Sequence, residues 1–332
     1  MEQHMNKERE YINQVLCNVY DNDHLIPPSE ADQISACLQQ AWLTPAGDQI
    51  YPYRPFLNPL ELCEAGGEIY EQMRSGLIHM AVTKVDIDVA AIASLVRKNG
   101  KIPELGRVAA NKQYVGNGYA TRAVKTCLEI AERVDRMPVF IGISANRSIM
   151  ESVLVNAAAK SGHKLTVLGL SPNCYKVQNE VSGNAYEWSE VDWIAFHEPL
   201  PPIPLSEEIS EPVANMVYRL VLRSKGSLQI EGANQTSGSS GHESIEDPLA
   251  LIDVKNAKKL QSLIDQGYYP VGIFPLVSED KRLVWHVKMY HGRLPKLNYE
   301  RQNAIAPGQS PVYVSKLESY RAMSLIWGGN NG

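Results

Sequence analysis

In the segment Tyr114-Val-Gly-Asn-Gly-Tyr-Ala-Thr121, two glycines stand directly before a helical pattern. From Ala120 onward, apolar residues recur at helical spacing, namely Ala120, Ala123, Val124, Cys127, Leu128, Ala131 and Val134. A glycine turn at a helix start presents converging backbone N–H groups and the positive end of the helix dipole. Two glycines alone indicate only a tight turn. Whether the turn binds phosphate must be judged from the neighbouring sequence.

The segments around this turn predict a mixed α/β fold. Three β-rich segments precede it, beginning at Leu77, Val89 and Glu104, and their short connections predict an antiparallel meander. The apolar run Met137–Ser144 suits a buried strand, and Asn146–Ser161 has the pattern of an amphipathic helix that ends before Gly162.

The longer stretch Leu105-Gly-Arg-Val-Ala-Ala-Asn-Lys-Gln-Tyr-Val-Gly-Asn-Gly-Tyr-Ala-Thr121 resembles the acyl-CoA signature of the GNAT (GCN5-related N-acetyltransferase) superfamily. The pattern [Q/R]-x-x-G-x-[G/A] falls on Val115–Ala120 in one frame, with Val115 in place of Arg or Gln, and on Gln113–Gly118 in a second frame. The first frame is preferred because Tyr114 and Ala120 then also fit. The resemblance covers about residues 77–135. It implies a mixed, mostly antiparallel sheet with flanking helices, followed here by a second, smaller α/β unit.

The resemblance also implies a set of site residues. Backbone groups of the turn would hold the coenzyme A pyrophosphate, and the strand before it would bulge and offer main-chain groups to pantetheine. On this chain the turn residues are Val115, Gly116, Asn117, Gly118, Tyr119, Ala120 and Thr121, and the strand residues are Val108, Ala109 and Ala110. The cosubstrate would be acetyl-CoA or another acyl-CoA, with no metal.

Acylation of an amine requires a neutral nucleophile and therefore a base. Many members of the superfamily carry a Glu on the strand before the turn, and Glu104 lies near that position, although an exposed carboxylate at a strand end explains it as well. The Tyr that often protonates the leaving thiolate has no counterpart in Asn156–His163. Tyr175 and Tyr268 are alternatives from elsewhere in the chain.

Two segments compete for the next helix of the family, which runs from an Asn to a Gly-aromatic pair. One is Asn146–His163, directly after the expected strand, and the other is Asn256–Tyr268. Either the C-terminal part is a second, motif-poor half, or a long insertion separates the core elements. The short connection favours the first segment as part of the core.

The expected organisation has four parts. Residues 1–76 are a helical N-terminal region and 77–200 are the acyl-CoA-binding core. Residues 201–247 hold a Pro-rich segment, a helix over about 207–222 and a flexible linker, and 248–332 form a C-terminal α/β unit.

Composition excludes several classes of protein. The 332 residues carry a formal charge of −5, which gives no chain-wide basic field for nucleic acid. No apolar run approaches the roughly 20 residues of a membrane span, and the N-terminus is charged, so a cytoplasmic protein is expected. Five cysteines with no CxxC pair indicate reduced thiols.

Other candidate sites are weaker. His79, His163 and His197 have no metal-ligand spacing and are expected to be structural, and Gly238–His242 is read as linker rather than as a nucleophile elbow. The expected activity is transfer of an acyl group from coenzyme A to a small-molecule or peptide amine. The alternatives are an N-acyl synthase that uses an acyl carrier protein and a non-catalytic binding scaffold.

Overall fold

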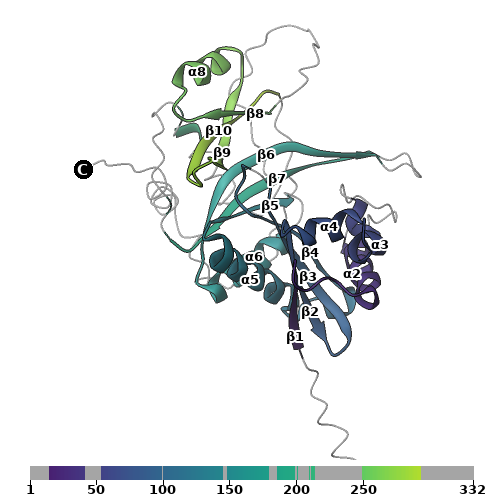
Figure 1. Cartoon of the computed structure of the whole chain (residues 1–332). Coiled ribbons are helices and arrows are strands. Elements are labelled where there is room, and N and C mark those ends of the chain that lie inside the picture. The colour runs from purple at the N-terminus through teal and green to yellow at the C-terminus, as the bar shows by residue number, and fades with distance from the viewer. Residues whose placement is uncertain are drawn as a thin grey trace, which may run out of the picture. The chain divides into compact units, whose positions relative to one another are not determined.

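The computed structural model describes residues 15–41, 54–98, 100–144, 148–178, 185–198, 200, 209, 211–213 and 249–292. The chain forms two compact units that alternate along the sequence (Figure 1). The first comprises Met1–Arg97, Glu104–Arg136 and Val177–Asn184, and the second comprises Lys98–Pro103, Met137–Lys176 and Ala185–Gly332.

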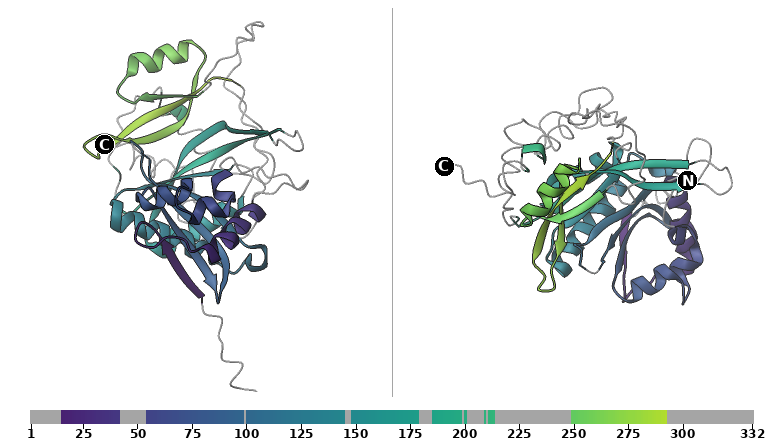
Figure 2. Two further views of the ribbon diagram at one scale, coloured as in Figure 1. Left: turned by 45° about the vertical axis from the view of Figure 1, so that its right-hand side comes forward. Right: turned by 90° about the horizontal axis from the view of Figure 1, so that it is seen from above.

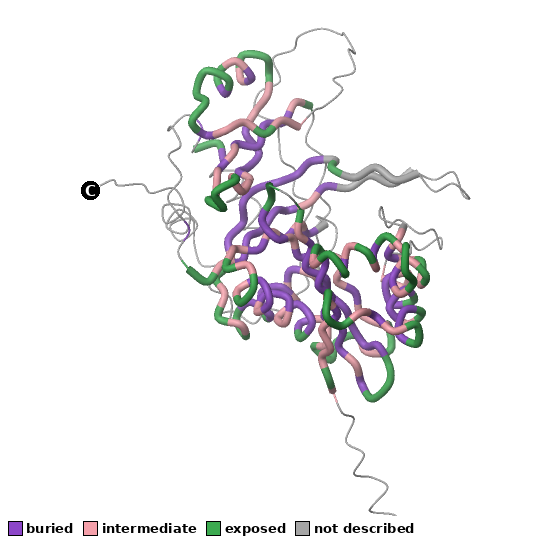
Figure 3. Tube along the Cα trace, in the orientation of Figure 1, coloured by how far each residue is buried: buried purple, intermediate pink, exposed green. Residues whose placement is uncertain are grey.

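The first unit is built on an antiparallel meander, as the sequence predicted. Strands β1 (Val15–Tyr20), β2 (Ile78–Val85), β3 (Asp88–Val96) and β4 (Glu104–Ala110) lie in this order, each paired with the next. A tight turn joins β2 to β3, with Asp86 in the left-handed region at φ 55°. Most positions of β2 and β3 are buried, because helices cover both faces of the sheet (Figure 3).

Four helical segments cover one face of this sheet: α2 (Pro28–Ala41), η2 (Arg54–Leu57), α3 (Pro59–Cys63) and α4 (Glu68–Arg74). Asn58 caps α3, since its side chain accepts the Leu60 N–H at 3.2 Å, and Pro59 occupies the first helical position. Alternation along β2 sends Met80 and Val82 into the core with these helices, whereas Thr83 points to the opposite face and contacts α5 (Tyr119–Ile130).

The helical prediction for residues 1–76 was wrong at one segment. Val15–Tyr20 is an edge strand that pairs with β2 from Val85 to Met80. The segment Val-Leu-Cys-Asn-Val-Tyr is short and rich in β-branched and aromatic side chains, so pairing with a neighbouring strand outweighs any local helical preference.

The second unit contains β5 (Val139–Ser144), α6 (Ser148–Ser161), β6 (Lys164–Gln178), β7 (Ala185–Phe196), β8 (Leu249–Asp253), α8 (Ala257–Asp265), β9 (Tyr269–Val277) and β10 (Leu283–Tyr290). Its strand order is β5-β7-β6-β9-β10-β8. Figure 2 shows α8 beside the strands β8 to β10. Both units therefore have the predicted mixed α/β architecture, in which antiparallel pairs predominate and helices flank the strands.

Two glycines allow β6 and β9 to meet. Gly169 pairs with Gly272, and a Cβ added to either residue would overlap the backbone of the opposite strand. Gly169 also has φ 146°, a conformation that other residues rarely adopt. Most of the predicted helix over 207–222 and all of the 231–247 linker lie outside the described residues, and the predicted domain boundaries stay predictions.

Candidate functional site

Both glycines of the turn adopt left-handed backbone conformations that favour glycine. Gly116 has φ 90° and Gly118 has φ 78°, and α5 begins at Tyr119 with Gly118 as its N-cap. A Cβ added at either glycine would meet no heavy atom within 4 Å, so the space above the turn is open. The helix start at Tyr119 agrees with the frame that places the motif on Val115–Ala120.

The start of α5 leaves backbone donors available at this open space. The first hydrogen bond of the helix runs from the Arg122 N–H to the Gly118 carbonyl at 3.1 Å. The N–H groups of Tyr119, Ala120 and Thr121 come before this bond and have no carbonyl one turn back in the helix. They point toward the turn along the positive end of the helix dipole, and the first turn of α5 has no acidic residue to oppose an anion.

Three contacts fix the chain that leads into the turn. The Asn111 N–H donates to the Ala90 carbonyl at 2.9 Å, at a point where β3 bulges. The Asn111 side chain then accepts the Gln113 N–H at 3.1 Å and caps the short helix η3 (Lys112–Tyr114). The Tyr114 hydroxyl donates to Asp88 at 2.8 Å, and this hydrogen bond raises the pKa of Tyr114.

Hydrogen bonds connect both ends of α5 to the sheet. At the N-terminal end, the Thr83 hydroxyl on β2 donates to the Tyr119 carbonyl at 3.2 Å. At the other end, α5 runs into a wider turn over Ala131–Asp135, and Asp135 accepts two hydrogen bonds from Arg97, at 2.6 and 2.8 Å. This bidentate pair is mostly shielded from solvent.

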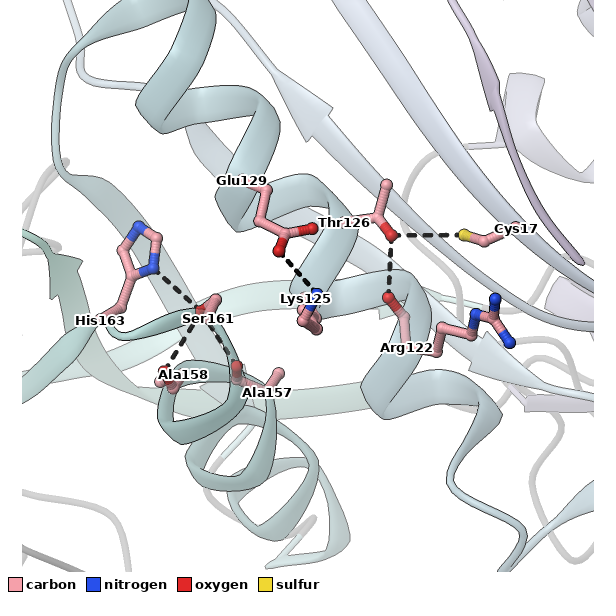
Figure 4. A network of polar contacts seen from close by, with 9 residues as sticks. All are labelled: Cys17, Arg122, Lys125, Thr126, Glu129, Ala157, Ala158, Ser161 and His163. Carbon is pink, nitrogen blue, oxygen red and sulfur yellow. Dashed lines mark hydrogen bonds and ion pairs between the residues drawn. The ribbon is translucent and has the colours of Figure 1, made fainter.

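A further link joins α5 to the edge strand. Figure 4 shows the Thr126 hydroxyl between the Arg122 carbonyl, at 3.1 Å, and the Cys17 sulfur, at 3.4 Å. The Thr83 hydroxyl oxygen also lies 3.8 Å from the Cys17 sulfur. Sequence reasoning missed Thr83, Asp88 and Thr126 because these contacts connect distant segments. Only Asn111 carried a local signal, as an Asn directly before a turn.

The strand before the turn bulges, as the resemblance implied. Gly106 pairs with Ser94 and Ala109 with Ile92, so Arg107 and Val108 together oppose the single residue Ala93. Arg107 has φ 52°, a left-handed conformation that is uncommon for a non-glycine residue. Its guanidinium lies over the Phe56 ring, 4.6 Å from the centroid. Val108, Ala109 and Ala110 follow between the bulge and η3.

Glu104 lies at the end of β4 opposite the turn. It is the first residue of the strand, pairs with Val96 and is half-buried. Six residue steps separate it from Ala110, which is about 20 Å along an extended strand. The structure therefore places the predicted base and the predicted phosphate turn at opposite ends of one bulged strand.

The remaining predicted residues do not join this group. His79 is buried on β2, and its pKa is lowered by burial and then by the charge of Arg97. In the second unit, His163 and His197 lie edge to face with ring centroids 5.8 Å apart, and His163 Nδ1 lies 2.9 Å from the Ser161 hydroxyl (Figure 4). Tyr268 follows α8, the side chain of Tyr175 lies outside the described residues, and so does all of Gly238–His242.

The part of the chain that the structure describes shows no sign of a metal site or a membrane-spanning helix. It holds no group of three or more His, Cys, Asp or Glu side chains arranged to bind a metal ion. Its helices include none with the length and apolarity needed to cross a membrane. No disulfide links the five cysteines, all of which are described.

About half of the chain is similar to bacterial acetyltransferases of known structure. The ribosomal-protein-S5-alanine acetyltransferase of Vibrio fischeri is 16% identical, and the match covers 53% of this chain and 91% of that one with a TM-score of 0.38. An N-acetyltransferase of Staphylococcus aureus Mu50 is 12% identical, with 55% and 98% covered and a TM-score of 0.40.

A third neighbour is a diaminobutyrate acetyltransferase from Paenibacillus lautus, solved with L-2,4-diaminobutyric acid and coenzyme A. It is 10% identical, with 55% of this chain and 95% of that chain covered and a TM-score of 0.38. No protein-family model and no curated protein matches the chain.

Proposed function

We propose that this protein is an acyltransferase of the GNAT superfamily that moves an acyl group from a coenzyme A thioester to an amine. The observation that carries the proposal is the turn itself. Two left-handed glycines with open space above them lead into a helix N-terminus, directly after a bulged strand. The turn and the helix N-terminus suit a phosphate group, and the bulged strand suits an extended chain attached to that group, as in coenzyme A.

The residues present fit the pyrophosphate of coenzyme A. Gly116 and Gly118 allow close approach, and the N–H groups at the start of α5 supply donors. Val115 is exposed and offers no cation, so the turn relies on backbone donors. Lys112 and Arg122 are exposed on either side of it and supply positive charge.

The bulge prepares β4 to pair with the pantetheine arm. An extra residue in a strand turns local main-chain groups away from the regular ladder. At Val108–Ala110 these groups would meet the amides of pantetheine, which then extends along β4 toward Glu104. When bound, the thioester supplies an acyl carbonyl that is activated toward nucleophiles.

Glu104 would act as the base. An amine is protonated at neutral pH and must lose a proton before its lone pair can form the new C–N bond. The Glu104 carboxylate would accept this proton directly or through water. As the C–N bond forms, the C–S bond breaks and coenzyme A leaves as a thiolate, which takes up a proton. A small-molecule or peptide amine is the acceptor class that this chemistry requires.

Two measurements test the proposal together. Calorimetric titration with acetyl-CoA should give saturable binding to the full chain, and a thiol-release assay over a panel of amines should identify acceptors. Binding without thiol release from any amine would leave a coenzyme-binding scaffold. Absence of acetyl-CoA binding, with thiol release only from acyl carrier protein thioesters, would favour the carrier-protein alternative.

A further inference from the structure

The second unit contains one structural order twice. Both β5-α6-β6-β7 and β8-α8-β9-β10 run strand, helix, strand, strand. The strands are also arranged alike in space, since β7 lies between β5 and β6, and β10 lies between β8 and β9. In the order β5-β7-β6-β9-β10-β8, equivalent strands therefore lie at equal distances from the centre, where β6 pairs with β9.

The two helices end in the same way. Gly162 after α6 has φ 74°, and Gly267 after α8 has φ 87°. A Cβ added at Gly162 would lie 3.9 Å from His197 Nε2, and one at Gly267 would lie 3.4 Å from His291 Nε2. These two histidines are the first residues after β7 and β10.

The residues that follow these glycines also match. The His163 ring contacts the His197 ring with centroids 5.8 Å apart, and the Tyr268 ring contacts the His291 ring with centroids 5.0 Å apart. In each half, the helix therefore ends at a left-handed glycine, and the ring of the next residue contacts the histidine that directly follows the last strand. Shared element order alone would not produce this agreement between side chains.

Strand register places two buried charges at equivalent positions. Ser144 and Asp253 end β5 and β8, and they pair with Glu190 and His286. Two residues before each strand end, Gly142 pairs with Asp192, and Leu251 pairs with Lys288. Asp192 and Lys288 therefore occupy corresponding places on β7 and β10. After Asp192, β7 continues for four residues, whereas β10 continues for two residues after Lys288. This difference of two residues does not change which face of the sheet each side chain occupies.

These equivalent charges meet at the centre of the arrangement. Lys288 Nζ forms an ion pair with Asp192, and the side chains are only 3% and 1% exposed. Ser171 on β6 accepts from Lys288 and lies 3.0 Å from both Asp192 oxygens. The Lys288 ammonium also lies 5.1 Å from the centre of the Phe274 ring on β9.

We propose that residues 249–292 are an internal copy of residues 139–197. The second copy pairs with the β6 edge of the first copy, in the place that a second subunit would take. The Asp192–Lys288 ion pair makes each copy pair with the other copy rather than with its own kind. If two first copies paired through β6, two Asp192 carboxylates would be buried together. If two second copies paired through β9, two Lys288 ammonium groups would meet. Both pairings bury like charges, whereas pairing of one copy with the other is neutralised.

An exchange of the two charges tests the equivalence. The single variants Asp192→Lys and Lys288→Asp should each lower the melting temperature by about 10 °C, because like charges are then buried together. The double variant carrying both substitutions should recover most of this loss, since it restores an ion pair with the charges exchanged between the two equivalent strand positions. A double variant that melts as low as either single variant would overturn the proposal.

Co-expression of the two single variants gives a second test, which holds even if neither folds alone. Exchange of the C-terminal copies between two chains would restore complementary pairs, Lys with Asp at one contact and Asp with Lys at the other. Native mass spectrometry should detect a soluble heterodimer of the differently tagged chains. Recovery of only monomers or of aggregated protein, with a well-folded wild-type control, would count against partner selection by this pair.

Discussion

Thr83 on β2 donates its hydroxyl proton to the carbonyl of Tyr119, the first residue of α5, at 3.2 Å. Thr83 is fully buried, so this bond joins α5 to the sheet from a side chain that is shielded from water. The N–H groups of the turn are therefore held in place before any ligand arrives. Under the proposed function, such preorganisation would make Thr83 a positioning residue for the turn.

Replacing Thr83 with Val should weaken acetyl-CoA binding up to about fivefold, because loss of one hydrogen bond costs about 1 kcal/mol. Thr83→Ser keeps the hydroxyl and should bind as the wild type does. Thr126→Val is a matched control on the same helix, away from the turn. Calorimetric titration measures all three, and equal affinities for Thr83→Val and wild type would remove the positioning role.

Gly118→Val should lower acetyl-CoA affinity more strongly, by at least tenfold. A β-branched residue disfavours φ 78°, and its side chain would project into the open space above the turn. Gly76 provides a control of the same conformation, since it has φ 73° and similarly open surroundings. Gly76→Val should lose similar stability and keep its affinity for acetyl-CoA.

Glu104→Gln should reduce kcat by about 10²–10⁴ and leave acetyl-CoA affinity nearly unchanged, because the amide keeps the shape and cannot accept the proton. The rate should recover partly at high pH, where more of the amine is already neutral. Glu129→Gln, on α5, is the control for loss of one carboxylate. Wild-type turnover of Glu104→Gln with an identified acceptor would assign the base elsewhere.

His79 should make the protein sensitive to acid. Burial lowers its pKa below the ordinary value of 6.5, so the unfolded chain binds a proton that the folded chain does not. Its contribution to stability is complete above about pH 6.5 and declines as the pH falls below that value. His79→Leu should flatten the melting-temperature profile between pH 7 and pH 5, and a profile parallel to that of wild type would exclude this role.

A buried ion pair in the first unit should contribute strongly to stability. Glu30 on α2 accepts from Lys84 on β2 at 2.7 Å and from the Tyr20 hydroxyl on β1, and it is buried. Lys84→Met leaves this carboxylate without its cation and should cost about 3 kcal/mol in denaturant unfolding. Tyr20→Phe removes one hydrogen bond to the carboxylate but leaves its cation in place, and should cost about 1.5 kcal/mol. Equal costs for the two variants would show that charge compensation is unimportant here.

Local patterns were sufficient for most elements of the fold. The meander from β2 to β4 and the helices α5, α6 and α8 followed from apolar periodicity and turn residues. The edge strand β1 was missed, and the long strand β6 was not singled out, because Pro172 and Asn173 interrupt its pattern. Strand pairing outweighed both local signals.

The sequence likewise predicted some features of the candidate site and not others. The turn conformation followed from Gly116 and Gly118, and the bulge followed from the resemblance rather than from any feature of Arg107 or Val108. The contacts that hold the turn involve Thr83 and Asp88, far from it in sequence. A single sequence carries no local sign of such partners.

The bulge in β4 makes one residue of this strand unnecessary for the sheet. Gly106 and Ala109 would keep their partners Ser94 and Ile92 if the strand were one residue shorter. Deletion of Val108 would thus produce an evenly paired β4 and let Arg107 return to an ordinary strand conformation. Strand pairing therefore does not require the extra residue. Under the proposed function, this residue would serve the pantetheine arm that lies along the strand.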